Sequence, residues 1–186
     1  MRIAGLAALA GLCVVVLFPA AGWSQYDDEE TGTSKFNIRL GYARLIGADD
    51  RQTAGKTWFT EVVTYDYKRD DEGRALTQIE LGMSEPSQST TASTVFAAAS
   101  QVWWKDAGKG QSWFGGVGIG AYRMKFIGDK TLKAGAQVFG GRTFGGAYFV
   151  ELRATILPSW TASNDFASVG LNLSSYTLSI GTTRLF

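Results

Sequence analysis

The side chains that could do chemistry form a set of charged residues at alternate positions of extended-looking segments. Alternation places such residues on one face of a strand, with the apolar residues on the other face. Because an unpaired buried charge is costly, charges on an enclosed face must pair with one another. The pattern predicts an interior salt-bridge network, and a gated polar path is the sharper alternative. Its candidate members are Arg39, Glu80, Lys133, Glu151 and Arg153, with Asn37, Gln78 and Gln137 beside them.

Other chemistry has little support in the sequence. There is no histidine, so a Ser–His arrangement cannot be built. A lysine-assisted serine or a carboxylate pair stays open, but no motif marks one. The acidic clusters at 27–30 and 70–72 lack the ligand spacing of a calcium loop. We therefore expect no enzyme activity, no catalytic residue, no metal site and no cofactor.

The N-terminus predicts export. Arg2 precedes an apolar stretch over 3–18, and a helix-breaking, mostly small-residue region follows it up to Ser24. We interpret 1–24 as a cleaved signal peptide, 25–34 as a flexible acidic segment and 35–186 as a β-barrel domain. Cleavage would remove Cys13, the only cysteine, and leave 17 basic against 17 acidic residues. A neutral chain gives no indication of a nucleic-acid partner.

The rest of the chain breaks into eight strand-like segments separated by turn signals. Their length suits tilted membrane crossings of about 9–11 residues. Alternation is clearest in the first, third, sixth, seventh and last segments. The facing of the other three is ambiguous, so Glu61 and Lys125 are further candidates for the interior. The segments are Lys35–Ile46, Thr57–Lys68, Arg74–Ser84, Thr91–Trp104, Ser112–Phe126, Thr131–Arg142, Ala147–Leu157 and Leu171–Phe186.

Loop lengths and aromatic residues favour a closed membrane barrel. Short connections at 69–73, 105–111 and 143–146 should face the periplasm. Of the four outer connections, 47–56 and 158–170 are longer, whereas 85–90 and 128–130 are short, so the asymmetry is weak. Aromatic residues gather near segment ends, as expected of interfacial girdles. The expected periplasmic girdle is Tyr65, Tyr67, Trp103, Trp104, Trp113, Phe114, Phe144, Tyr148 and Phe186. The expected outer girdle is Trp58, Tyr122, Phe126, Trp160 and Tyr176.

Glycines at 115, 116, 118 and 120 lie inside a strand-like segment with no helical pattern after them. A nucleotide-binding loop would open a helix, so this run does not indicate one. We expect these glycines to make room for bulky interior side chains or to allow barrel curvature.

Three stretches resemble the small outer-membrane barrels of the OmpA membrane-domain, OmpX and opacity type: 114–120, 147–153 and the ending 178–186. The terminal Phe186 resembles the signal by which the assembly machinery recognises such proteins. Thr182 and Arg184 depart from the pattern, since an apolar lipid-facing residue is expected there. The resemblance implies an all-β, eight-stranded antiparallel up-and-down transmembrane barrel. It also implies a place in the cell outer membrane of a Gram-negative envelope. Barrel enzymes of similar architecture depend on a histidine that this chain lacks.

Three functions remain in view. The first is a non-enzymatic outer-membrane barrel with a structural or surface-interaction role, contacting outer-membrane lipid, the assembly machinery during biogenesis and an unidentified surface ligand. The second is a narrow channel for ions or small solutes. The third is a secreted soluble barrel that binds an apolar ligand, which requires the apolar faces to point inward.

Overall fold

The computed structural model describes residues 36–69, 75–88, 92–108, 111–144, 147–163 and 168–182. The expected signal peptide, the acidic segment 25–34 and Phe186 lie outside the described residues. None of the helices in the described ranges is long and apolar enough to cross a membrane.

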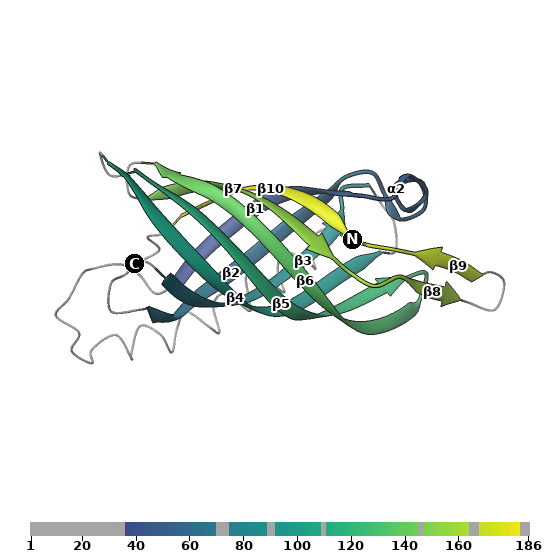
Figure 1. The fold of residues 1–186 in the computed structure, drawn as a ribbon. Helices are drawn as coiled ribbons and strands as arrows, with labels where there is room; N and C mark the ends of the chain where they lie inside the picture. Colours follow the sequence, from purple (N-terminus) through teal and green to yellow (C-terminus); the bar gives the residue numbers. More distant parts are fainter. Residues whose placement is uncertain are drawn as a thin grey trace. The chain divides into compact units, whose positions relative to one another are not determined.

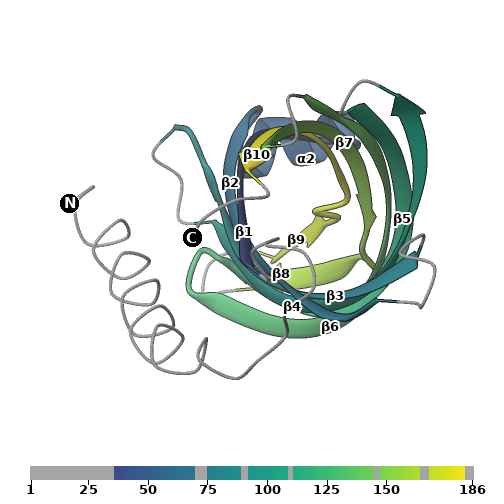
Figure 2. The same cartoon turned by 90° about the vertical axis from the view of Figure 1, so that its left-hand side faces the viewer.

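Eight antiparallel strands close into a barrel in the order β1-β10-β7-β6-β5-β4-β3-β2 (Figures 1 and 2). Neighbours along the chain pair with each other, except that β7 pairs with β10 and β10 closes the barrel on β1. This confirms the predicted fold class. The strands are β1 (Phe36–Leu45), β2 (Trp58–Arg69), β3 (Ala75–Pro86), β4 (Ser93–Gly108), β5 (Gln111–Phe126), β6 (Asp129–Phe144), β7 (Tyr148–Ile156) and β10 (Ser175–Thr182).

Two predicted outer loops contain regular structure. The connection from β1 to β2 includes the helix α2 (Ala48–Ala54), and the connection from β7 to β10 includes the hairpin of β8 (Trp160–Ser163) and β9 (Ser168–Leu171). We call the end of the barrel that carries them the loop end and the opposite end the turn end (Figure 1).

The last strand is shorter than predicted. Leu171 pairs with Trp160 of β8 instead of starting the barrel strand. The backbone N–H of Ser174 then donates to the side chain of Asn172 at 2.8 Å, an Asx-type turn that ends the extended run. The barrel strand therefore begins at Ser175.

The strands are staggered around the barrel. The stagger can be traced by stepping from each residue to its partner on the next strand. Starting at Phe36 of β1, these steps pass through β2 to β6 and reach Ile156 of β7. The next steps return to β1 near Ile46 and not at Phe36. A sheet that closes with this stagger has strands tilted relative to the barrel axis. The tilt determines which side chains from different strands lie at the same level of the interior.

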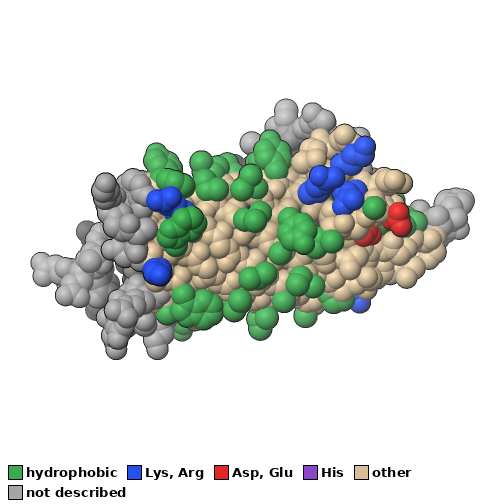
Figure 3. Space-filling model, turned by 45° about the horizontal axis from the view of Figure 1, so that its top comes forward, with side chains coloured by type: hydrophobic (Ala, Val, Ile, Leu, Met, Phe, Trp, Pro, Cys, Tyr) green, Lys and Arg blue, Asp and Glu red, His purple; other side chains and the backbone are tan. Residues whose placement is uncertain are grey.

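Apolar side chains cover the outside of the barrel, and Lys and Arg side chains gather toward the ends of this surface in the view of Figure 3. Ile119 is 73% exposed and Leu132 is 67% exposed. In the five clearly alternating segments the polar face lies inside, as predicted. The structure also gives the ambiguous strands a facing: Val62, Ser100 and Tyr122 point inward. Glu61 and Lys125 alternate with buried neighbours, so both lie on the outer face.

The predicted outer girdle is largely wrong. Trp58, Tyr122, Phe126 and Trp160 are buried in one hydrophobic cluster, and only Tyr176 is exposed. At the turn end, Tyr67, Trp103, Trp113, Phe144 and Tyr148 are exposed as predicted, whereas Phe114 is buried and packs with Trp104. These errors have two causes. The facing of β2 and β5 is ambiguous in the sequence, and Trp160 lies in the β8–β9 hairpin and not in a barrel strand.

Gly116 shows why the glycine run lies in β5. A Cβ atom at this position would lie 2.5 Å from the Phe139 ring and 2.7 Å from the carbonyl oxygen of Gln101. The missing side chain therefore makes room for a bulky interior neighbour, as predicted.

Candidate functional site in the barrel lumen

Two arginines and two glutamates meet near the middle of the lumen. Arg39 extends from β1, Glu80 from β3, and Glu151 and Arg153 from β7. All four are buried, and Glu80 is fully buried. They point inward because each alternates along its strand with exposed apolar residues of the outer face. We call these four residues the central ion network.

Each arginine bridges both glutamates. Arg39 donates to Glu80 at 2.8 Å and to Glu151 at 2.9 Å. Arg153 donates to Glu80 at 2.6 Å and, through Nε, to Glu151 at 2.9 Å. The four formal charges sum to zero, and each buried charge has a counter-charge within hydrogen-bonding distance. This arrangement offsets the large desolvation cost of placing ions in a protein interior.

Polar residues complete the network from β4, β5 and β6. Ser100 donates to Glu80 at 2.5 Å, and Gln137 donates to the same Glu80 oxygen at 2.9 Å. The carbonyl oxygen of Gln137 accepts from Arg153 at 2.6 Å and from Tyr122 at 3.2 Å. The Arg153 guanidinium also lies 4.1 Å from the centre of the Phe139 ring. Six of the eight strands are thereby joined across the lumen by side chains.

Lys133 does not belong to the central ion network. It lies on the inner side of β6, four residues from Gln137 toward the loop end, which is about 13 Å along a strand. Among the described residues it forms no ion pair with Glu80 or Glu151. Alternation shows the face on which a charge lies but not its level along the barrel, and Lys133 was grouped with the others on facing alone.

Two of the predicted companions form a separate group. Asn37 and Gln78 both donate to Asp66, at 3.3 and 3.0 Å. Ser100 and Tyr122 are members of the central arrangement that the sequence analysis missed. Both lie in strands with ambiguous alternation, where alanines and glycines occupy both faces, so the sequence carries only a weak signal for them.

A hydrophobic cluster closes the loop end. We call this cluster, which joins inward side chains of the barrel to α2 and the β8–β9 hairpin, the loop-end plug. Hydrogen bonds hold the hairpin in place: Asn172 N donates to Asp50 at 2.8 Å, and Ser163 N donates to Asp129 at 3.2 Å. Its buried members are Ala43, Leu45, Ala54, Trp58, Ala92, Tyr122, Met124, Phe126, Leu157, Trp160, Ala162, Leu171 and Leu173.

A second cluster narrows the lumen on the turn-end side of the network. Leu76, Val102, Phe114, Phe139 and Phe149 are its buried members. The Phe114 ring packs edge-on against Phe149, with centroids 5.8 Å apart. The interior is thus packed with side chains at three successive levels, as an eight-stranded barrel of this width allows.

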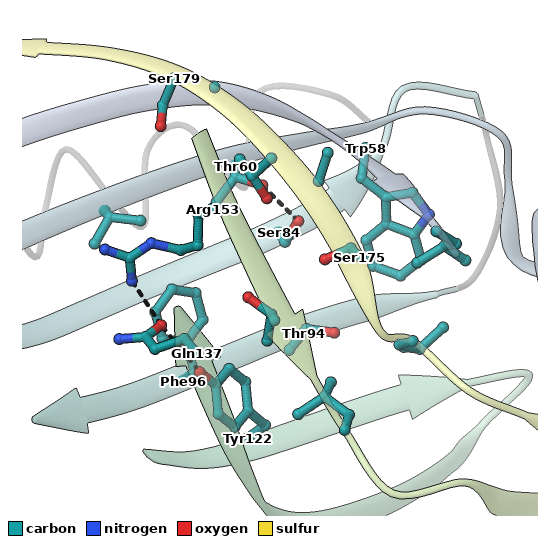
Figure 4. Close-up of a pocket in the computed structure, with 18 of the residues that line it drawn as sticks. Trp58, Thr60, Ser84, Thr94, Phe96, Tyr122, Gln137, Arg153, Ser175 and Ser179 are labelled. Atoms are coloured by element: carbon teal, nitrogen blue, oxygen red, sulfur yellow. Dashed lines mark hydrogen bonds between the residues drawn. The ribbon is translucent and has the colours of Figure 1, made fainter. Parts of the chain in front are cut away.

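A small cavity separates the central ion network from the loop-end plug (Figure 4). Arg153 and Gln137 bound it on one side and Trp58 on the other, and Thr60 and Ser84 hydrogen-bond to each other at 2.8 Å on its wall. Its volume is about 50 Å³. A water molecule needs roughly 10–15 Å³ of such space, so a few waters fit but a larger ligand does not. The arrangement can hold water and brace the strands.

Comparison with family models and with curated proteins finds no match. Among solved structures, neisserial surface protein A matches with a TM-score of 0.54 and 12% identity, over 83% of this chain and 100% of that one. The N-terminal barrel domain of Pseudomonas aeruginosa OprF matches with a TM-score of 0.47 and 10% identity, over 81% of this chain and 98% of that one. The Yersinia pestis outer membrane protein Ail matches with a TM-score of 0.44 and 13% identity, over 82% and 99%.

Identities this low bear on the fold and not on the activity. The chain therefore has the fold of the small eight-stranded outer-membrane barrels, as represented by neisserial surface protein A.

Proposed function

We propose that this protein is a non-enzymatic outer-membrane barrel with a closed lumen, and that its loop end serves a structural or surface-interaction role. The observation that carries the proposal is the central ion network between two hydrophobic clusters. A lumen packed in this way braces the wall and leaves the loop end as the place for contact with partners.

The outer surface supports a location in a membrane. Large apolar side chains such as Leu40, Leu152 and Ile180 are exposed on the barrel wall. In water this would be an extended apolar patch of the kind that soluble monomers avoid. Exposed aromatic side chains border it at the turn end, where tyrosine and tryptophan favour the membrane interface. Outer-membrane lipid and, during biogenesis, the barrel-assembly machinery are the partners that this location entails.

The same facing argues against a secreted barrel that carries an apolar ligand. Such a protein needs apolar side chains inside and charges outside, but Arg39, Glu80 and Glu151 are buried inside. The cavity of about 50 Å³ is also far smaller than the roughly 300 Å³ or more of a typical ligand pocket.

The channel alternative requires movement of packed side chains. Within the described residues, ions would have to pass the Arg–Glu bridges as well as the loop-end plug. Opening such a path breaks several buried charge-assisted hydrogen bonds, which are among the stronger polar interactions in proteins.

The loop end supports a surface-interaction role because hydrogen bonds hold the described parts of two of its connections. Hydrogen bonds join Asn172, which follows β9, to α2, and β8 to the start of β6. A surface that is already ordered loses less conformational entropy when it binds a partner.

Two measurements test this proposal. Cell fractionation should place the protein in the outer membrane, with a mobility in gel electrophoresis that changes on boiling. Recovery from the soluble periplasm without such a change would overturn the location.

The second measurement is single-channel recording in planar bilayers. The wild-type barrel should give no conductance steps, whereas a variant that opens both barriers, Arg39→Ala/Arg153→Ala combined with Trp58→Ala, should begin to leak. Regular conductance steps from the wild-type protein would replace the closed barrel with the channel. An exposed pair of substitutions, Arg44→Ala/Lys105→Ala, serves as the control for loss of positive charge.

A further inference from the structure

Three positive side chains lie together on the outer face of the β5–β6 hairpin. Arg123, Lys125 and Lys130 are all exposed. Lys125 is the direct cross-strand partner of Lys130, and Arg123 is two residues from Lys125 on the same face of β5. We call these three residues the basic triad.

The geometry of the hairpin holds these charges close together. Only Ile127 and Gly128 connect the paired residues Phe126 and Asp129, and both have positive φ angles, 44° and 94°. A two-residue turn of this kind matches the twist of the strands and sets their register. The side chains of Lys125 and Lys130 therefore start from neighbouring positions, with Cβ atoms roughly 5 Å apart.

Like charges directly opposite each other destabilise a strand pair. Among the described residues, none of the three forms an ion pair with a carboxylate. The adjacent Asp129 accepts hydrogen bonds from the backbone N–H groups of Lys130 and Ser163. The basic triad thus concentrates positive charge that the described part of the chain leaves without a salt bridge.

The triad begins where the apolar surface ends. On β5 the outward residues are Val117, Ile119 and Ala121, and then Arg123 and Lys125. On β6 the outward residues from Ala136 to Leu132 are apolar, and Lys130 follows at the same end. If the apolar surface faces lipid tails, the basic triad lies at the depth of the headgroups.

We infer that the basic triad binds phosphate groups of anionic lipid headgroups in the leaflet at the loop end. This inference rests on the proposed membrane location. Phosphate suits the site because arginine binds it with two parallel hydrogen bonds, while lysines add point charges. Neutralisation by phosphate also removes the repulsion between Lys125 and Lys130.

Native mass spectrometry of the purified full-length protein in neutral detergent micelles tests the inference, with diphosphorylated lipid A as the probe. The variant is Arg123→Gln/Lys125→Gln/Lys130→Gln. The matched control, Arg44→Gln/Lys56→Gln/Lys105→Gln, removes the same charge from exposed positions elsewhere. We expect the triad variant to bind lipid A roughly a hundredfold more weakly, since each cation near an anionic lipid contributes about a factor of five. The control variant should bind like the wild type.

Separate outcomes distinguish the two proposals. Failure of the wild type to insert into vesicles contradicts the membrane location. If the wild type inserts but the triad variant and the control variant bind lipid A equally well, or lose lipid A binding equally, the basic triad is not the site. Displacement of lipid A by millimolar inorganic phosphate would show a free-anion site and would also overturn the lipid assignment. Retained binding of the dephosphorylated lipid by the wild type would exclude phosphate as the group recognised.

Discussion

Glu80 is the residue whose substitution should disturb the lumen most, because four side chains donate to its carboxylate. Arg39, Arg153, Ser100 and Gln137 all lie within 2.9 Å of its oxygens. Glu80→Gln keeps the shape of the side chain but removes its charge. Two buried arginines then share the single negative charge of Glu151, and the centre of the barrel carries a net positive charge.

Breaking a buried ion pair by removing one partner costs about 3–5 kcal/mol. We expect Glu80→Gln to lower the free energy of unfolding by that amount, and Arg39→Gln to do the same with the opposite excess charge. The double variant is neutral again and keeps the Arg153–Glu151 bridge at 2.9 Å. It should therefore be less destabilised than the sum of the single variants, by about 1–3 kcal/mol, as is usual for coupled residues.

Guanidinium unfolding in detergent micelles, followed by tryptophan fluorescence, measures these differences. Glu85→Gln is the control, since Glu85 is an exposed carboxylate and its loss should change stability by less than about 0.5 kcal/mol. The reasoning fails if the Glu80 and Arg39 effects add to within about 0.5 kcal/mol, because additive effects would mean that the charges act independently.

Three further substitutions probe the packing of the wall and the lumen. Gly41→Val should destabilise the barrel by about 1–3 kcal/mol, because a Cβ there would lie 2.7 Å from the backbone oxygen of Leu178. Gly170→Ala, with open space around it, is the control in the same denaturation assay, and equal effects would contradict the close approach. Gly128→Ala should cost about 1 kcal/mol, because φ is +94° while no atom obstructs the side chain; an unchanged denaturation midpoint would refute strain at this turn. Trp58→Ala should cost about 3–5 kcal/mol by opening a hole in the loop-end plug, yet planar bilayers should stay silent, because the central ion network remains intact. Conductance from this variant would show that the loop-end plug, and not the central ion network, blocks the passage of ions.

The predicted interior charges show how far sequence patterns reach into the site. Arg39, Glu80, Glu151 and Arg153 could be assigned to the inner face because each alternates with large apolar residues. Their mutual contact could not be derived from alternation, since it depends on the stagger of strands that are distant in sequence. For the same reason, Lys133 faces the interior as predicted but lies at a different level along the barrel from the other four charges. Ser100 and Tyr122 lacked even a facing signal, because small residues occupy both sides of their strands.

The sequence by itself determined the eight-stranded architecture, since long alternating segments between turn signals leave few ways to bury one face of each strand. Only the tertiary structure decided what closes the lumen. Trp58 and Trp160 look like interfacial residues in the sequence, yet both pack inside with α2 and the β8–β9 hairpin. The physical reason is that a strand pattern specifies two faces, whereas the folding of a connection over the barrel mouth depends on long-range hydrophobic contacts and on hydrogen bonds such as that from Asn172 to Asp50.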